Sequence, residues 1–159
     1  MSDLKLTIEL VPSSSWNQNL RSLLKPQMWE NLRKEVYKKY NYKCAICLQP
    51  GGLPARRVSL HAHEVWKYDD ENHVQKLVDL IALCSKCHAI KHIGFAGIQA
   101  SVGYLDYEEL VKHFMKVNNC NRETFEKQQK EAYKKFEKRS KYEWSLDLQD
   151  YKDKITGRV

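Results

Sequence analysis

Two C-x-x-C pairs constrain the fold of this chain more than any other feature of its sequence. Cys44 and Cys47 form the first pair, Cys84 and Cys87 form the second, and residues 48–83 separate them. Paired cysteines at this spacing are typical of a four-cysteine structural zinc site. The separation is longer than in a usual zinc ribbon, so we expect an inserted structural unit between the pairs. The alternative is a redox-active C-x-x-C, which needs only one pair and a thioredoxin-like context.

The rest of the chain favours reduced thiols. A fifth cysteine, Cys120, makes the number odd, and the N-terminal residues show no basic stretch followed by an apolar one. Both observations argue against a disulfide framework and for an intracellular, cytoplasmic protein. No apolar run is long enough to span a membrane, so no membrane partner is expected.

Length and charge narrow the choice of partners. The chain has 159 residues, which fits one domain with a small appended subdomain. Its 27 lysines and arginines exceed its 20 aspartates and glutamates, giving a formal net charge of +7. A positive excess favours an anionic partner such as nucleic acid, although it does not prove one. No feature indicates the oligomeric state, and both a monomer and a homodimer remain open.

Hydrophobic periodicity divides the chain into three parts. Apolar residues alternate over residues 3–10, which predicts a strand. They recur at helical spacing over residues 27–40, after Pro26, which favours the first turn of a helix. We therefore predict an N-terminal strand and linker over residues 1–26, a zinc domain over residues 27–100, and a basic helical extension over residues 101–159.

Strands and a helix are also expected around the second cysteine pair. A strand is predicted over residues 56–66, followed by a short strand or an irregular connection over residues 67–73 and an apolar stretch over residues 77–83. A short helix should begin inside the second pair. In the extension, Asp106 with Glu109 forms a capping box at the start of one helix. A second helix should run from Glu123 to about Ser140, and residues 143–151 should form a closing strand or arm.

Histidines gather in the same region. Five of the six histidines lie between residues 61 and 92. His88 and His92 are four residues apart, so on a helix they share one face. A third imidazole from a neighbouring strand would complete a three-histidine metal site with open positions. His63 is the natural third ligand, and His61 competes with it because both lie on the same strand face.

On these residues the chain resembles the HNH endonucleases, the ββα-metal nucleases, over roughly residues 29–95. The resemblance places His63, His88 and His92 in the metal positions and Glu64 in the position of the general base. Asp79 occupies the position of the family's asparagine, and the four cysteines match the zinc site that often holds the ββα unit together. The implied fold is α+β: a small ββα-metal core stapled by the C-x-x-C…C-x-x-C zinc site, with an N-terminal strand and a C-terminal helical extension.

The sequence departs from the family at two positions. The base position holds Glu64 instead of histidine, and the asparagine position holds Asp79. A carboxylate can act as a base if burial raises its pKa. Three states stay open: an active enzyme with Glu64 as base, an active enzyme with a histidine such as His61 as base, and a catalytically weakened protein. A shift of one residue would instead make His63 the base.

The resemblance implies metal-dependent hydrolysis of phosphodiester bonds in DNA, with RNA as a further possible substrate. The cofactors would be a structural Zn²⁺ and a second divalent ion, Mg²⁺, Mn²⁺, Ni²⁺ or Zn²⁺, at the histidines. Four cations near the site are candidates for phosphate contacts: Arg56, Arg57, Lys67 and Lys91. The rival functions are a zinc-stabilised nucleic-acid-binding protein without catalysis and a protein-interaction module on the same scaffold.

Overall fold

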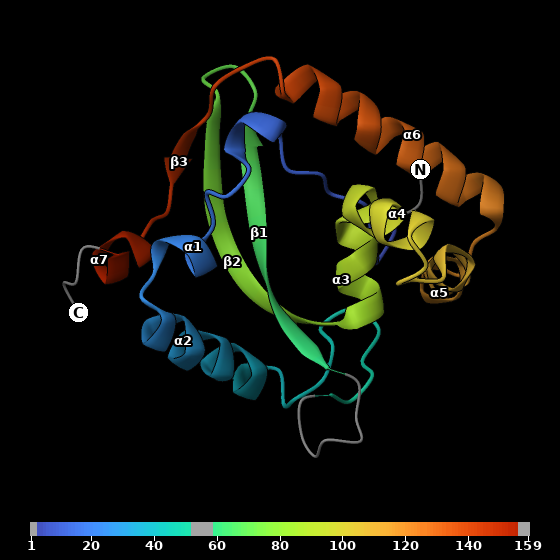
Figure 1. Ribbon diagram of the computed structural model, residues 1–159, viewed down its shortest axis with the longest axis horizontal. Helices are drawn as coiled ribbons and strands as arrows, with labels where there is room; N and C mark the ends of the chain where they lie inside the picture. Colours follow the sequence, from blue (N-terminus) through green and yellow to red (C-terminus); the bar gives the residue numbers. More distant parts are fainter. Residues whose placement is uncertain (1–2, 52–58, 156–159) are drawn as a thin grey trace.

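The computed structural model describes residues 3–51 and 59–155. Within them the fold is mixed α+β, as predicted, with one three-stranded sheet and seven α-helices (Figure 1). The strands are β1 (Leu60–Asp69), β2 (Val74–Cys84) and β3 (Ser145–Asp147). The helices are α1 (Leu20–Leu23), α2 (Pro26–Lys39), α3 (Ser85–Lys91), α4 (Ile93–Ser101), α5 (Tyr107–Asn118), α6 (Arg122–Arg139) and α7 (Tyr151–Ile155). None of the helices in these ranges is long and apolar enough to cross a membrane.

A long antiparallel hairpin of β1 and β2 forms the centre of the molecule. The strand order is β1-β2-β3, so β1 lies at an edge of the sheet, and β3 is parallel to β2. In the hairpin register His63 lies opposite Ile81 and Glu64 lies opposite Leu80. The connection predicted over residues 67–73 is largely regular, because β1 continues to Asp69 and a turn over residues 70–73 leads into β2.

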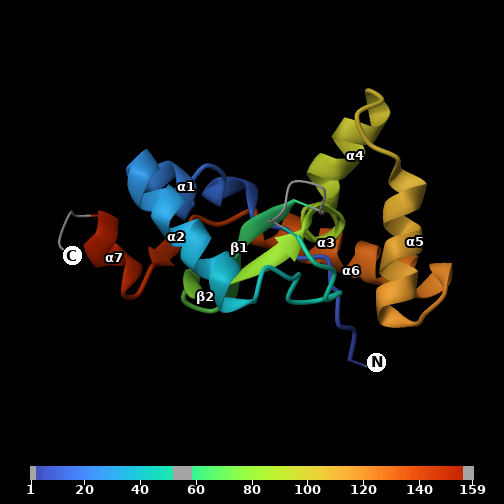
Figure 2. The same cartoon turned by 90° about the horizontal axis from the view of Figure 1, so that it is seen from below.

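The hairpin separates two hydrophobic cores. One core joins it to α1 and α2 through Leu20, Leu32 and Leu80. The other joins the end of β2 to α3, α5 and α6. Figure 2 shows the hairpin between α1 and α2 on one side and α3–α6 on the other. The alternation along β2 explains the division, since neighbouring residues of a strand point to opposite faces.

The strand predicted over residues 3–10 is wrong, although its alternation has a structural cause. Leu6 and Ile8 are buried, as the pattern requires, but the segment pairs with no strand of the described chain. Side-chain amides bind its backbone instead. Leu6 exchanges two hydrogen bonds of 2.9 Å with Asn118 of α5, and the backbone N–H of Ile8 donates to Gln128 of α6 over 2.8 Å. Alternating burial therefore indicates an extended segment here, and it does not require that the segment belong to a sheet.

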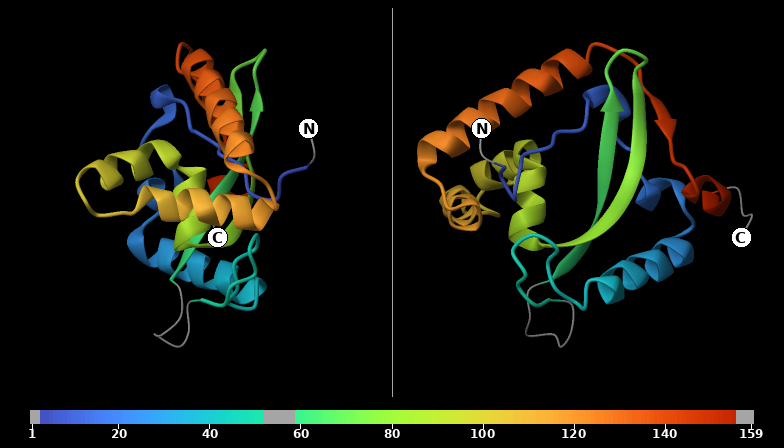
Figure 3. Two further views of the ribbon diagram at one scale, coloured as in Figure 1. Left: turned by 90° about the vertical axis from the view of Figure 1, so that its right-hand side faces the viewer. Right: turned by 180° about the vertical axis from the view of Figure 1, so that it is seen from behind.

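The C-terminal extension folds around this N-terminal segment. Asp106 caps α5 as predicted, accepting hydrogen bonds from the backbone N–H groups of Glu108 and Glu109. Helix α6 matches the predicted basic helix, and its end lies beside the β1–β2 turn (Figure 3), where Arg139 pairs with Asp70 over 2.8 Å. β3 is a short part of the predicted closing strand, and α4 was not expected from the sequence.

Candidate metal centres

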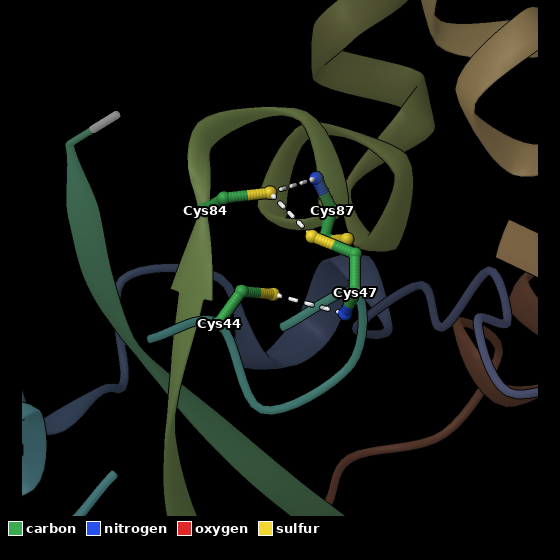
Figure 4. A group of neighbouring side chains, drawn as sticks. All are labelled: Cys44, Cys47, Cys84 and Cys87. Carbon is green, nitrogen blue, oxygen red and sulfur yellow. Dashed lines mark hydrogen bonds between the residues drawn. The ribbon is translucent and has the colours of Figure 1, made fainter. Parts of the chain in front are cut away.

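The four cysteines converge at the point where β2 ends and α3 begins. Cys44 and Cys47 lie in the loop after α2, Cys84 ends β2, and Cys87 lies in the first turn of α3 (Figure 4). Their Sγ atoms all lie within 4.8 Å of one another. All four are free thiols, and the 3.6 Å between the Sγ atoms of Cys47 and Cys84 is far longer than a disulfide bond. The predicted cluster is therefore present and compatible with a structural zinc site.

Backbone groups fix the two knuckles, which are the two short segments that carry the C-x-x-C pairs. The N–H of Cys47 points at the Sγ of Cys44 over 3.5 Å, and the N–H of Cys87 points at the Sγ of Cys84 over 3.4 Å. The first knuckle is tied to β2 by the Ala45 N–H, which donates to the Ala82 carbonyl over 2.8 Å. Because it accepts the Cys87 N–H, the Cys84 thiol caps the N-terminus of α3.

A fifth side chain lies at this cluster and was not predicted from the sequence. His113 of α5 is buried, and its Nε2 lies 3.2 Å from the Sγ of Cys87. The only signal in the sequence was its spacing, three residues after Leu110 and four before Val117, which puts it on the inward face of α5.

The three histidines predicted as metal ligands also meet. His63 comes from β1, His88 lies in α3, and His92 follows directly after α3. Each offers a ring nitrogen, and these atoms lie within 4.8 Å of one another. We call His63, His88 and His92 the histidine cluster. The His61 ring stacks on that of His88 with 4.8 Å between centroids, so His61 lies beside the cluster without joining it.

Burial keeps these imidazoles neutral. It lowers the pKa of His63 to about 2 and that of His88 to about 3, and their positively charged forms would also repel neighbouring histidines. Burial likewise lowers the pKa of His92 and of His61. A neutral imidazole has a free lone pair, which is the form that binds a metal or accepts a proton.

Glu64 follows His63 in β1, but its carboxylate contacts α1 and not the histidine cluster. Its Oε2 accepts a hydrogen bond of 3.0 Å from the backbone N–H of Leu20, the first residue of α1. Burial raises the pKa of Glu64 to about 7, although the Leu20 hydrogen bond opposes the shift. At neutral pH this carboxyl group is therefore only partly ionised.

This raised pKa predicts a pH-dependent effect of Glu64→Gln on stability. The folded protein keeps a proton that the unfolded chain releases above about pH 4.5, so the parent should lose stability as pH rises toward about 7. Glutamine carries no charge and can still accept the Leu20 hydrogen bond. We expect the variant to gain roughly 2–3 kcal/mol over the parent at pH 8 and almost nothing at pH 4.5. Urea unfolding at both pH values measures this. The control is Glu71→Gln at an exposed turn position, and an equal difference at both pH values would contradict the prediction.

The structure places the other residues predicted for the site at different distances from the histidine cluster, and only one of those that it describes lines the cleft with a free side chain. Asp79 lies on β2 with its Oδ1 3.5 Å from the Nζ of Lys39, and it is absent from the lining of the cleft described below. Lys91 does not match a phosphate-binding role, because its side chain is buried and bound by Glu9 at 2.7 Å and by Thr7 at 3.0 Å. Arg56 and Arg57 lie outside the described residues. Lys67 is exposed and lines the cleft.

The histidine cluster opens into a cleft of about 1320 Å³ that follows the free edge of β1. Residues 8–11 and 15–19 line it together with residues of α2, α4 and α6. His63 is only 4% exposed, and His88 and His92 are half-buried residues of the same lining. The arrangement can hold a metal ion where a ligand from solvent reaches it, as a catalytic centre requires.

In comparisons with known proteins, no family model matches this chain, and no curated protein or solved structure shows significant similarity to it. The features that bear on its function are the geometry of the two clusters and of the cleft.

Proposed function

We propose that this chain is a metal-dependent endonuclease of the HNH type that hydrolyses phosphodiester bonds in DNA. The observation that carries the proposal is the convergence of three histidines, from β1, from α3 and from the residue after α3, in the lining of one cleft. In this proposal β1, β2 and α3 form the ββα-metal unit, and the four cysteines hold a structural Zn²⁺ beside it.

The donor set fits a second divalent ion. His63, His88 and His92 would hold it, and imidazole donors suit Zn²⁺ or Ni²⁺ better than Mg²⁺, which prefers oxygen. An ion bound there supplies Lewis-acid stabilisation of the negative charge that develops on the phosphate. The chain supplies the remaining functions, which are positioning of the strand and removal of a proton from the attacking water.

Between the candidate bases, the contacts favour His61 over Glu64. The His61 ring is neutral and lies against His88, whereas the contact made by the Glu64 carboxylate is with α1. We propose that a ring nitrogen of His61 accepts the proton from water. Cleavage by His61→Ala and Glu64→Gln tests this assignment. We expect a loss of about 10²–10⁴-fold for the first variant and a smaller loss for the second. The reverse order would assign the base to Glu64.

The function is tested by nicking of supercoiled plasmid DNA. Protein that retains one zinc per chain is freed of other metals and supplied separately with Mg²⁺, Mn²⁺, Ni²⁺ or Zn²⁺. We expect open-circular product with at least one of the imidazole-preferring ions. If folded protein gives no product with any ion, the enzyme is excluded. Salt-dependent DNA binding would then identify a binding module.

If the four cysteines bind zinc, His113 would form a hydrogen bond with the ligating sulfur of Cys87. Hydrogen bonds to ligating groups tune metal sites, and losing one typically costs 10–100-fold in affinity. We expect His113→Ala to lower zinc affinity by about that factor, and His113→Gln to recover part of it because an amide N–H can donate to sulfur. Competition with a chromophoric chelator measures the affinity. The control is Lys112→Ala, at an exposed position of the same helix; equal affinities in all variants would show that the contact has no effect on zinc.

A further inference from the structure

The cleft above the histidine cluster is lined by exposed aromatic side chains. Trp16 is 60% exposed and Phe95 is 62% exposed, and the half-buried Trp29 and Trp66 also line the cleft. The position of Trp16 is fixed, since its indole N–H donates to the Val11 carbonyl over 3.0 Å and its ring stacks on Phe136. Ordered aromatic rings of this kind form stacking platforms for unpaired bases.

The same cleft carries positive charge from several elements. Arg21 of α1, Lys67 of β1 and Lys135 of α6 are exposed, and none forms an ion pair within residues 3–51 and 59–155. The cleft's other two arginines are occupied, Arg33 by Glu30 and Arg139 by Asp70. Unpaired cations and exposed aromatic rings in one cleft are the features with which proteins bind the backbone and the bases of a single nucleic-acid strand.

The size of the cleft limits the form of that nucleic acid. Its volume of about 1320 Å³ is only somewhat larger than the roughly 300–1,000 Å³ of small-ligand pockets. Its lining comes from the N-terminal segment and from α2, α4 and α6, and it includes the buried His63. A cleft of this volume is too small to enclose a double helix, whereas a single strand could enter it.

Polar atoms in the lining also lack partners. Both amide atoms of the Gln75 side chain and the Oγ of Ser15 are buried without a hydrogen bond to any described residue, and both residues line the cleft. Buried polar groups are normally paired, so a group from water or from a ligand would complete them.

From these features we infer that the cleft accepts an unpaired DNA strand, and that the enzyme cuts single strands or unpaired segments in preference to intact duplex. The inference rests on the proposed nuclease function and names the substrate class of the same site.

Fluorescence anisotropy tests the inference with a labelled 12-nucleotide oligothymidylate and a hairpin duplex of the same length. The His88→Ala protein prevents cutting during the measurement. We expect the single strand to bind at least tenfold more tightly. Adding Trp16→Ala or Phe95→Ala should weaken its binding about tenfold, in line with the loss of one stacking contact. The matched control is Tyr104→Ala, which removes an aromatic ring that is 83% exposed and outside the cleft.

Cleavage by the parent protein separates failure of this inference from failure of the proposed function. Faster cutting of single strands and supercoiled plasmid than of linear duplex supports both. Cutting of linear duplex with equal or tighter duplex binding overturns the inference and leaves the nuclease standing. Binding of single strands that depends on Trp16 and Phe95, without any cutting, supports the inference as a binding property and removes the enzyme.

Discussion

Replacing His88 with alanine is expected to lower the rate of metal-dependent DNA nicking by at least about a thousandfold, to the limit of detection. The His88 ring lies against both other members of the histidine cluster, with centroids 5.5 Å from His63 and 4.8 Å from His92. Its loss leaves two nitrogen donors, and metal stabilisation of the reacting phosphate contributes several kcal/mol to the rate. Nicking of supercoiled plasmid at saturating metal measures the effect.

A second histidine provides the matched control. His73 lies in the β1–β2 turn, where it stacks on Tyr142, and it does not line the cleft. His73→Ala should keep nearly the parent rate. Both variants should retain one zinc per chain and melt within a few degrees of the parent. A His88→Ala protein that nicks DNA at close to the parent rate would place the chemistry elsewhere.

Removal of zinc is expected to unfold the region around α3. The four cysteines connect the loop after α2, the end of β2 and α3, and Cys44, Cys84 and Cys87 belong to the core that contains α5 and α6. Structural zinc contributes about 10–16 kcal/mol in zinc-finger peptides, whereas a whole domain is stable by about 5–15 kcal/mol. We expect a strong chelator to abolish the cooperative thermal transition seen by circular dichroism, and added Zn²⁺ to restore it.

Cysteine variants distinguish loss of a ligand from general sensitivity to cysteine replacement. Cys87→Ser should reproduce the effect of chelation, because a hydroxyl is a poor substitute for thiolate. Cys120→Ser should change the melting temperature by only a few degrees, since Cys120 is partly exposed and lies outside the cysteine cluster. If zinc-free protein, verified by elemental analysis, melts as the parent does, then the cluster is not a structural zinc site.

The parts of the site that could be predicted are those encoded by local spacing. Cys84, Cys87, His88 and His92 lie within nine consecutive residues of one strand end and one helix, so their relative positions follow from helix geometry. His63 required one further step, the pairing of β1 with β2. The α+β class followed in the same way, from segments whose periodicity matched their burial.

The parts that could not be predicted depend on contacts distant in sequence. Leu6 is held by Asn118, 112 residues away, and Cys87 meets His113, 26 residues away. Lys91 looked like a free cation because Glu9, its partner, lies on a segment whose docking site no local pattern reveals. Such contacts depend on how the elements pack against one another, and hydrophobic periodicity gives information only on each element by itself.

The short helix α3 carries candidate ligands of both clusters, and this sharing has a consequence for how the chain can vary. Cys87 and His88 are adjacent, and each residue turns an α-helix by about 100°. One residue inserted between them would keep all seven candidate ligands in the sequence, yet it would rotate His88 and His92 away from His63. An inventory of ligands is therefore insufficient to judge a related sequence. The angular phase between the second knuckle and the two helix histidines must be preserved as well.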